Sequence, residues 1–451
     1  MPLRPLVIAA PASGHGKTSV TLALLAALSR RGVKVAPFKV GPDFIDPGHH
    51  ARACGRESRN LDGWMCGRTQ VAQTFARGCT GAEVAVVEGV MGLFDGASGS
   101  DASGSSAQIA DWLSGRVVLV VDAARQARSA AALVKGFVAF DPQLEFAGVI
   151  FNNVASPNHA ELLREALEST PGLPPLLGCL ARDPEVALPE RHLGLLTAEE
   201  AGRDTDFFAH LADWLEAGVE LEPLLKMVRG GQAEAPSLSE PSPAGVRIGV
   251  ARDEAFCFYY RDNLEALEAA GAELVEFSPL HDPALPERLD GLYLGGGYPE
   301  VHAEQLVANA GLRAQIRGRI EAGMPVYAEC GGLIYLCEAV DGQPLCGALS
   351  AEAQMLSKRK ALGYRDVALS EAGPLGPAGT RVRGHEFHYS QLTMPAHIER
   401  VYRVFDRKGR ELEPEGYRVH NLLASYVHLH FGSAPQVAGY LVDFFRSHAL
   451  P

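Results

Sequence analysis

A glycine-rich segment near the start of the chain has the composition of a phosphate-binding loop. Residues 10–18 read Ala-Pro-Ala-Ser-Gly-His-Gly-Lys-Thr and stand between an apolar run and a helical pattern. Glycines let backbone N–H groups curl round phosphate oxygens, and the start of the next helix adds positive potential. In such a loop Lys17 reaches the β- and γ-phosphates, and the Thr18 hydroxyl binds Mg²⁺. The residues expected to contact a nucleotide are Gly14, His15, Gly16, Lys17, Thr18 and Ser19.

The loop departs from the strict phosphate-loop pattern at one position. Pro11 stands where the first glycine is expected, so the match is a variant. The alternative interpretation is an ordinary turn between a strand and a helix. We favour the phosphate loop because a strand precedes it and a helix follows it, over residues 19–29 with Gly32 as a stop.

Four carboxylates follow predicted strands, where a nucleotide and its metal would lie. Parallel sheets bind ligands at the carboxyl ends of their strands. Each of these acids, taken alone, is more often a helix cap or a turn residue, but four beside a phosphate loop indicate a site. An amide at the end of another strand either reads a purine edge or forms a turn. The residues are the carboxylates Asp43, Asp46, Glu88 and Asp95 and the amide Asn152.

A cysteine in the second half of the chain stands between a strand and a helix. Cys330 follows the run Val326–Glu329 and precedes two glycines, which permit a sharp turn. The start of a helix stabilises a thiolate, and a nucleophilic thiol also needs a base. His428 is the candidate base, with His430 facing the other way if that segment is extended. The alternative is a buried, inert thiol, which is how we interpret Cys337 and Cys346.

Backbone N–H groups for an oxyanion are expected near this cysteine. Gly296 and Gly297 follow the predicted strand 291–294, and Gly331 follows the cysteine itself. A second histidine pair, His385 and His388, has a superficial likeness to a metal cluster. Its spacing lacks His-Glu-x-x-His, so the sequence does not favour zinc there.

Short β-branched runs alternate with helical patterns in both halves of the chain, which predicts parallel sheets covered on both faces. A stretch with almost no large apolar residue lies between the halves and is interpreted as a linker. The predicted parts are domains 1–228 and 246–451 and the linker 229–245. The predicted strands are Leu6–Ala10, Val33–Val40, Val84–Glu88, Val117–Asp122, Ala147–Asn152, Arg247–Ala251, Leu274–Phe277, Gly291–Leu294 and Val326–Glu329.

Composition excludes several functional classes. The chain has 451 residues, 47% hydrophobic and 21% charged, so large cores can form and general disorder is excluded. A net charge of −13 argues against a nucleic-acid coat or a polybasic membrane binder. The eight cysteines form no Cys-x-x-Cys pair and are typical of reduced thiols in the cytoplasm. We expect neither a signal peptide nor a membrane span.

One chemistry joins a phosphate loop to a nucleophilic thiol. A carboxylate resists amidation because its oxygen is a poor leaving group, and transfer of a γ-phosphoryl group from ATP makes an acyl phosphate that reacts readily. The cysteine site would release ammonia from glutamine through a thioester, and ammonia would then attack the acyl phosphate. The two halves together therefore predict a glutamine-dependent ligase.

The chain resembles the cobyrinate a,c-diamide synthase family over nearly its whole length. The blocks 39–47 and 188–195 are the most specific carriers of this resemblance. The sister family of cobyric acid synthases shares the two-domain plan but lacks the Gly-Pro-Asp-Phe-Ile-Asp-Pro block. The carriers are residues 10–18, 39–47, 88–96, 188–195, 255–260, 294–300, 329–332, 363–365, 384–388 and 425–430.

The resemblance implies two α/β domains, each doubly wound: a phosphate-loop domain similar to dethiobiotin synthetase, then a class I glutamine amidotransferase domain of flavodoxin-like fold. It implies amidation of the a and c acetates of a corrin, with ATP, Mg²⁺ and glutamine as partners. Cys330 would be the nucleophile and His428 its base, with the orienting third group left open. Metal ligands would be Thr18, Asp46 and Glu88, while Asp43 and Asp95 would touch the corrin or the nucleotide.

Alternatives remain open at this stage. A regulatory or partitioning ATPase of the deviant-loop type, carrying a degenerate amidotransferase tail, would bind nucleotide without hydrolysing glutamine. Within the enzyme class, cobyrinic acid, metal-free hydrogenobyrinic acid and a nickel sirohydrochlorin all present paired acetates. The sequence does not fix the order of the two amidations, the route of ammonia or the oligomeric state, for which a homodimer is one arrangement.

Overall fold

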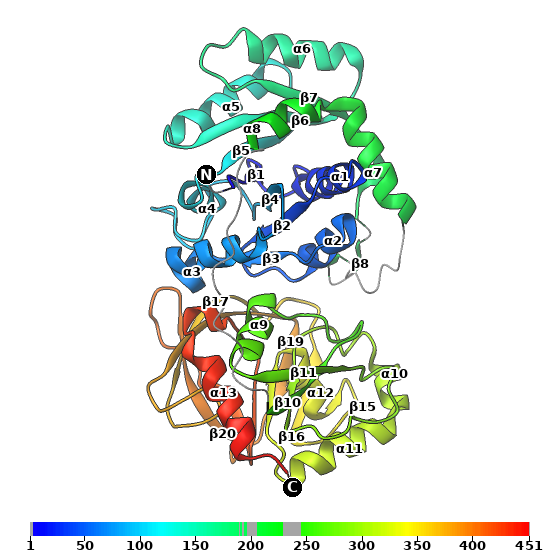
Figure 1. Cartoon of the computed structure of the whole chain (residues 1–451), viewed down its shortest axis with the longest axis vertical. Helices are drawn as coiled ribbons and strands as arrows, with labels where there is room; N and C mark the ends of the chain where they lie inside the picture. The colour runs from blue at the N-terminus through cyan, green and yellow to red at the C-terminus, as the bar shows by residue number, and fades with distance from the viewer. Residues whose placement is uncertain (1–2, 189, 192–193, 196–204, 229–244, 451) are drawn as a thin grey trace. The chain divides into compact units, whose positions relative to one another are not determined.

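The computed structural model divides the chain into two compact units, residues 1–236 and 237–451 (Figure 1). The expected linker 229–245 lies outside the described residues except for its last position, so the domain bounds drawn from the sequence stay a prediction. Each unit has its own sheet and its own helices. The structure describes residues 3–188, 190–191, 194–195, 205–228 and 245–450.

The first unit is built on a seven-stranded sheet in which every described pairing is parallel, in the order β3-β2-β4-β1-β5-β6-β7. Because the strands are parallel and the order reverses direction beside β1, their carboxyl ends create a ligand site at that edge. The strands are β1 (Leu6–Ala9), β2 (Val35–Val40), β3 (Arg59–Leu61), β4 (Val84–Glu88), β5 (Arg116–Asp122), β6 (Glu145–Val154) and β7 (Leu176–Ala181), with a ribbon of β8 (Glu190–Arg191) and β9 (Gly194–Leu195).

Helices cover both faces of this sheet. Alternate strand residues point to opposite faces, so Ile8 packs with the helices α1, α7 and α8, while Val7 packs with α3 and α4. Residues of β5 and β6 such as Val121 pack with α5 and α6. The helices are α1 (Lys17–Arg30), α2 (Ile45–Cys54), α3 (Gly63–Gly78), α4 (Ser106–Trp112), α5 (Arg128–Phe140), α6 (Pro157–Glu168), η1 (Pro184–Val186), α7 (Thr205–Gly218) and α8 (Leu221–Val228).

The second unit contains a ten-stranded mixed sheet in the order β11-β10-β12-β13-β22-β21-β20-β17-β18-β23. Pairings from β11 to β22 are parallel, and those from β22 to β23 are antiparallel. The strands are β10 (Val246–Ala251), β11 (Ala272–Phe277), β12 (Gly291–Leu294), β13 (Val326–Glu329), β17 (Ala361–Leu369), β18 (Arg381–His388), β20 (Glu399–Asp406), β21 (Glu415–Val419), β22 (Leu422–Ser425) and β23 (His428–Leu429).

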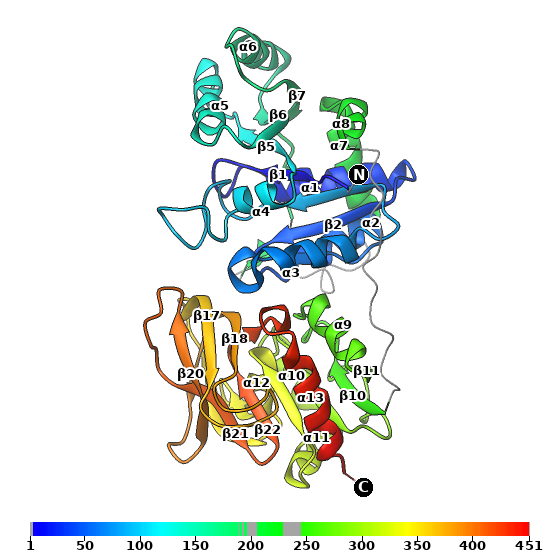
Figure 2. The ribbon, with the colours of Figure 1, turned by 60° about the vertical axis from the view of Figure 1, so that its left-hand side comes forward.

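A smaller sheet and several helices complete the second unit. Helices α9 and α13 pack against one face of the large sheet and lie side by side, as Figures 1 and 2 both show. Helices α10, α11 and α12 pack against the other face together with the small sheet. These elements are α9 (Arg261–Ala269), α10 (Ala303–Ala308), α11 (Ala310–Glu321), α12 (Gly331–Leu336), η2 (Phe431–Ser433), α13 (Gln436–Ser447), β14 (Cys337–Val340), β15 (Gln343–Pro344), β16 (Leu349–Met355) and β19 (Ser390–Thr393).

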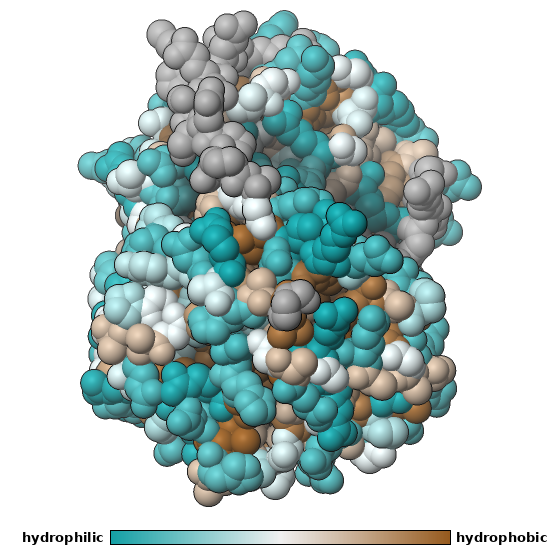
Figure 3. All heavy atoms as spheres, turned by 60° about the horizontal axis from the view of Figure 1, so that its bottom comes forward, coloured by the Kyte–Doolittle hydropathy of each residue, from teal (hydrophilic) through white to brown (hydrophobic). Residues whose placement is uncertain are grey.

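All nine predicted strands are present, and Val84–Glu88, Gly291–Leu294 and Val326–Glu329 have the predicted bounds. The antiparallel part of the second sheet was not predicted, because strands such as β17 lack a continuous apolar run. The first six residues of β17 are half-buried or exposed, and only its last three are buried. Hydrophilic side chains cover most of the face shown in Figure 3, with small apolar patches between them. Among the described residues, no helix combines the length and apolarity that a bilayer crossing requires.

Candidate active sites

The phosphate loop joins β1 to α1, as the sequence predicted. Gly14 and Gly16 have φ angles of +83° and +89°, which glycine adopts without strain. A side chain at position 16 would collide with Asn152, since a Cβ added there would lie 2.2 Å from the amide nitrogen Nδ2. The loop therefore requires glycine at this position for two independent reasons.

The three polar residues predicted beside the loop help to hold it in place. The amide nitrogen of Asn152 donates to the carbonyl of His15 (3.1 Å), and the His15 ring accepts from the N–H of Asp122 (2.9 Å). The Ser19 hydroxyl donates to the carbonyl of Val186 (3.0 Å). In this arrangement Asn152 braces the loop from the end of β6, and a contact with a purine edge stays a prediction.

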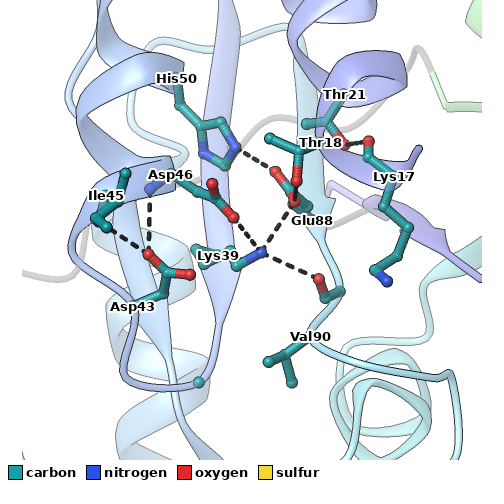
Figure 4. A network of polar contacts seen from close by, with 12 residues as sticks. Lys17, Thr18, Thr21, Lys39, Asp43, Ile45, Asp46, His50, Glu88 and Val90 are labelled. Carbon is teal, nitrogen blue, oxygen red and sulfur yellow. Dashed lines mark hydrogen bonds and ion pairs between the residues drawn. The ribbon is translucent and has the colours of Figure 1, made fainter. Parts of the chain in front are cut away.

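The Thr18 hydroxyl and Glu88 meet, as expected from their places at the start of α1 and the end of β4. Thr18 Oγ1 donates to Glu88 Oε1 over 2.7 Å. The other oxygen of the same carboxylate lies 2.7 Å from His50 Nε2, and His50 Nδ1 lies 3.0 Å from the Ser58 hydroxyl. Figure 4 shows the contacts of Glu88 with Thr18 and His50. The Glu88 side chain is completely buried.

A buried lysine lies between Asp46 and Glu88. Its ammonium nitrogen is 2.6 Å from Asp46 Oδ2 and 2.9 Å from Glu88 Oε1 (Figure 4). Burial alone would lower the pKa of this Lys39, but the two carboxylates outweigh burial and raise it. Burial alone would likewise raise the pKa of Glu88, yet Lys39 and His50 bring it below its ordinary value. The cluster therefore holds charged groups away from water by pairing them.

Lys17 and Asp95 belong to the neighbouring loop. Lys17 Nζ donates to the carbonyl of Met91 (2.5 Å) and to that of Ala12 (3.4 Å). Burial and the nearby Lys39 lower the pKa of Lys17. Asp95 accepts the N–H of Gly92 (2.9 Å), which shapes the loop after β4.

Asp43 caps the start of α2 rather than joining the buried cluster through its side chain. Its Oδ1 accepts the N–H groups of Ile45 (2.8 Å) and Asp46 (3.1 Å). Burial, followed by the charges of Asp43 and Glu88, raises the pKa of Asp46. A contact between Asp43 and a substrate is therefore left as a prediction, while its capping role is directly visible.

The donor set fits a magnesium ion. Mg²⁺ prefers hard oxygen ligands, usually one or two carboxylates with water and phosphate oxygens. The Thr18 hydroxyl oxygen and the Glu88 carboxylate oxygen Oε1 lie 2.7 Å apart beside the phosphate loop, so both could bind one ion. Asp46 is the third predicted ligand, and its Oδ2 is held by the ammonium of Lys39.

Cys330 forms the predicted elbow. Its φ angle is +45° with ψ of −100°, a strained conformation for a non-glycine residue between β13 and α12. The backbone N–H donates to the carbonyl of Ser425 (2.7 Å), and Sγ lies 3.9 Å from the carbonyl of Phe387. Burial, assisted by the charge of Glu300, raises the pKa of the thiol. The thiol is therefore protonated at neutral pH.

His428 is positioned by β23, which pairs with β18 so that His428 stands opposite His385. The two rings stack with centroids 5.0 Å apart. Burial, with a contribution from His388, lowers the pKa of His428 to about 3. At neutral pH the ring is uncharged and able to accept a proton.

Of the three predicted oxyanion donors, Gly296 is committed elsewhere. Its N–H donates to the carbonyl of Phe258 over 3.3 Å. The glycine instead gives His428 room, because a Cβ added at 296 would lie 2.2 Å from His428 Cε1. Gly297 and Gly331 lie against each other, since a Cβ added at 331 would be only 2.9 Å from the nitrogen of Gly297. These two remain the predicted donors.

Comparison with known proteins decides the family. A cobyrinate a,c-diamide synthase of Syntrophotalea carbinolica is 50% identical over 98% of both chains. A hydrogenobyrinate a,c-diamide synthase of Streptomyces coelicolor is 45% identical over 98% of this chain and 97% of its own. A cobyrinate a,c-diamide synthase of Dehalococcoides mccartyi is 42% identical over 96% of each.

The chain belongs to the cobyrinate a,c-diamide synthase family. Residues 6–196 match the CobQ/CobB/MinD/ParA nucleotide binding domain, and residues 247–436 match the CobB/CobQ-like glutamine amidotransferase domain. The family identity confirms the resemblance found in the sequence. The first domain alone is shared with MinD and ParA, whereas the full-length relatives are synthases, so the partitioning ATPase is not the family of this chain.

Sequence reasoning missed several residues that this synthase buries beside its two sites. Lys39 and His50 both lie in or next to the block 39–47 that carries the family resemblance, which was the available signal. Glu329 directly precedes Cys330 and was treated only as the end of a strand. His388, which the sequence placed in a metal-like pair, has protein partners at both ring nitrogens. Its Nε2 is 2.8 Å from Glu386 Oε1, and its Nδ1 is 2.8 Å from the carbonyl of Ser390.

Proposed function

We propose that this chain amidates the a and c acetate carboxylates of a corrin macrocycle, cobyrinic acid or hydrogenobyrinic acid, with ATP and glutamine in cobalamin biosynthesis. The observation that carries the proposal is that one chain combines a phosphate loop beside buried acids with a strained cysteine on an elbow and a neutral histidine in the same unit. The names of the full-length relatives support the substrate class. The reaction makes the protein a carbon–nitrogen ligase.

In the first unit the chemistry is activation of an acid. A corrin carboxylate oxygen attacks the γ-phosphorus of ATP, ADP leaves, and an acyl phosphate forms. Lys17 would bind the phosphate oxygens, and N–H groups of residues 14–18 would surround them. Thr18, Glu88 and Asp46 would hold Mg²⁺, which would neutralise phosphate charge.

In the second unit the chemistry is glutamine hydrolysis. His428 takes the proton of the Cys330 thiol, and sulfur attacks the side-chain amide carbon of glutamine. The N–H groups of Gly297 and Gly331 stabilise the negative oxygen. His428 returns the proton to the nitrogen, ammonia leaves, and water then cleaves the thioester to glutamate. Ammonia attacks the acyl phosphate and releases inorganic phosphate with the new amide.

We place the working domains at 1–228 and 246–451, joined by the linker 229–245. Eight free cysteines, none in a disulfide, support a reducing compartment such as the cytoplasm.

Removing the thiol tests the division of labour. Cys330→Ala should abolish glutamine-dependent amidation while ammonia-dependent amidation persists, because only the nitrogen source depends on the thiol. The measurement is amide formation with each donor at saturating ATP. Equal loss with both donors would show that the second unit does more than supply ammonia.

Removing the loop lysine tests the other half. Lys17→Ala should stop amidation with either nitrogen donor, because activation of the carboxylate fails, while glutamine hydrolysis in the second unit remains measurable. Ammonia-dependent amidation that survives in this variant would remove the assignment of the phosphate loop.

The substrate is tested directly. Purified protein with ATP and glutamine should convert cobyrinic acid or hydrogenobyrinic acid to a diamide, detected by mass. A nickel sirohydrochlorin serves as the competing acceptor with paired acetates. Amidation of that macrocycle, with both corrins left unchanged, would overturn the proposed substrate class.

A further inference from the structure

Glu329 is a buried carboxylate directly before the nucleophile. It ends β13, and its side chain is 2% exposed. Two hydroxyls donate to it, that of Tyr327 over 2.6 Å to Oε1 and that of Tyr293 over 3.1 Å to Oε2. A carboxylate placed so far from water needs such donors, and their presence fixes the direction in which its oxygens point.

The same carboxylate holds the strand that carries His428. Its Oε1 accepts the backbone N–H of Leu429, the residue after His428, over 3.0 Å. Its Oε2 lies 3.9 Å from His428 Nδ1. One side chain from the strand of Cys330 thus holds the backbone next to the histidine by a hydrogen bond and places a carboxylate oxygen on the side of the ring where Nδ1 lies.

We propose that Glu329 is the positioning residue of the glutaminase site. Its carboxylate keeps Nδ1 of the His428 ring facing Glu329, so that the other ring nitrogen, Nε2, accepts the proton of the Cys330 thiol. This inference rests on the proposed function of the second unit. In hydrolytic triads a buried carboxylate sets the tautomer of the histidine and stabilises the cation that forms when the ring takes a proton. Here that carboxylate comes from the residue before the nucleophile.

The other nearby carboxylate has different partners. Glu386 contributes charge near His428, but its Oε2 binds Arg365 Nε over 2.6 Å and its Oε1 lies 2.8 Å from His388 Nε2. Both oxygens of Glu386 therefore already have partners on β17 and β18, namely the Arg365 guanidinium and the His388 ring. Of the two carboxylates, Glu329 is the one whose oxygen lies 3.9 Å from the His428 ring nitrogen.

The ionisation of Glu329 is compatible with this role. Burial raises its pKa to about 7, although the hydroxyls of Tyr327 and Tyr293 and the N–H of Leu429 oppose the change. When the His428 ring takes the thiol proton, its positive charge favours the ionised form of the facing carboxylate, and the two groups titrate as a pair. The negative charge is thus greatest when the ring is positive.

The test uses the full-length protein with Glu329→Gln, which keeps the size of the side chain and removes the charge. We expect kcat for glutamine hydrolysis to fall about 10²-fold, the lower end of the range for general acid–base catalysis. KM for glutamine should stay within about threefold, since a positioning residue acts on the chemical step and not on substrate binding. Ammonia-dependent amidation should be unchanged.

The matched control is Glu415→Gln. Glu415 is also buried, its pKa is likewise raised to about 7, first by burial, and it binds the Ser425 hydroxyl and the N–H of Tyr426, both over 2.7 Å. This control should leave the glutaminase kcat within about threefold of the original protein. An equal fall in Glu415→Gln and Glu329→Gln would overturn the inference, because burial of any carboxylate would then explain the loss.

A second variant covers the case in which Glu329→Gln does not fold, as judged by its thermal unfolding. Tyr327→Phe keeps the carboxylate but removes the shorter of its hydroxyl contacts, and the expected result is a fall in kcat of about tenfold with KM unchanged. Unchanged kcat in Tyr327→Phe and in any folded Glu329→Gln overturns the inference. Glutamine-dependent amidation that persists in Cys330→Ala would instead overturn the proposed function, so the two failures are distinguishable.

Discussion

Glu88 concentrates the electrostatics of the first unit on one side chain. It is fully buried, yet Thr18, Lys39 and His50 each contact it, from three different elements. Breaking a buried ion pair by removing one partner typically costs about 3–5 kcal/mol, because the remaining charge stays buried without compensation. The cluster is therefore a point at which single substitutions should affect folding as well as chemistry.

Lys39→Met should destabilise the first unit by about 3–5 kcal/mol, since Asp46 and Glu88 would lose the ammonium between them. The measurement is urea unfolding of the purified protein followed by circular dichroism. Lys34→Met, on the exposed side chain just before the same strand, is the matched control and should change stability by less than about 0.5 kcal/mol. Equal stability of the two variants would contradict the account of the cluster.

The buried acid Glu415 predicts a pH dependence of the second unit. Burial raises its pKa from 4.5 to about 7, so the folded state binds a proton more tightly than the unfolded state does. Its contribution to stability is therefore fully present below pH 4.5 and is lost as the pH rises through 7.

In Glu415→Gln this loss should be absent, and the variant should gain up to about 3 kcal/mol relative to the original protein between about pH 4.5 and 8. The measurement is the unfolding free energy at a series of pH values. A constant difference between the two proteins across this range would show that the carboxylate does not titrate on unfolding.

Which residue contacts could be predicted depended on their position along the strands. Thr18 and Glu88 were expected to meet because both stand at the carboxyl edge of a parallel sheet. Lys39 was not, since a lysine inside an apolar run gives no sign of whether its ammonium reaches water or a buried acid. Glu329 was missed because its partners Tyr293 and Leu429 come from distant parts of the sequence, and no local pattern indicates that they meet.

At the scale of elements, the phosphate loop is held by its neighbours as well as by its own glycines. The side-chain amide of Asn152, in β6, donates to the carbonyl of His15. The same amide nitrogen would lie 2.2 Å from a Cβ added at Gly16. Both Gly14 and Gly16 have left-handed φ angles, but only Gly16 faces a close neighbour, since no described atom lies within 4 Å of a Cβ added at 14.

Gly16→Ala should therefore lower nucleotide affinity at least about tenfold, whereas Gly14→Ala should have a smaller effect. Both substitutions carry the backbone cost of about 1–2 kcal/mol for a left-handed non-glycine residue, and only the first also displaces Asn152. The measurement is ATP binding by calorimetry. Similar affinities in the two variants would mean that the contact with β6 does not shape the loop.

Strands were easiest to predict where both faces of the sheet are covered, because such strands consist mainly of apolar residues. The predicted strands, which are β1, β2, β4, β5, β6 and β10 to β13, belong to the parallel parts of the sheets and consist largely of apolar runs. The strands β3, β7 and β22, which also pair in parallel, were not predicted. The strands β17, β18 and β20 mix buried residues with exposed and half-buried ones, and in a single sequence this resembles a loop with scattered apolar residues. The site on β23, only two residues long, was located through His428 and not through any strand pattern.

At the scale of the whole molecule, the described apolar side chains form clusters that stay within one unit. The clusters of the first unit contain residues up to Met227, and those of the second begin at Val246. Each unit should therefore have the cores needed to fold by itself.

Separate expression of residues 1–228 and 246–451 should give two fragments that each unfold cooperatively on heating. The first should still bind ATP, because every described contact of its loop comes from the same unit. Glutamine-supported amidation should require both fragments, while ammonia-supported amidation should need only the first. A fragment that shows no cooperative transition by calorimetry would contradict this account of the cores.

The tight hold on the Glu88 carboxylate has a consequence for ion choice. A carboxylate whose two oxygens are fixed by donors on three elements has little freedom to swing outward. Calcium needs longer bonds and about six to eight flexible ligands, whereas magnesium demands a small, near-octahedral shell. The rigid acid should thus make the synthetase reaction run with magnesium and stall when calcium is the sole divalent cation offered.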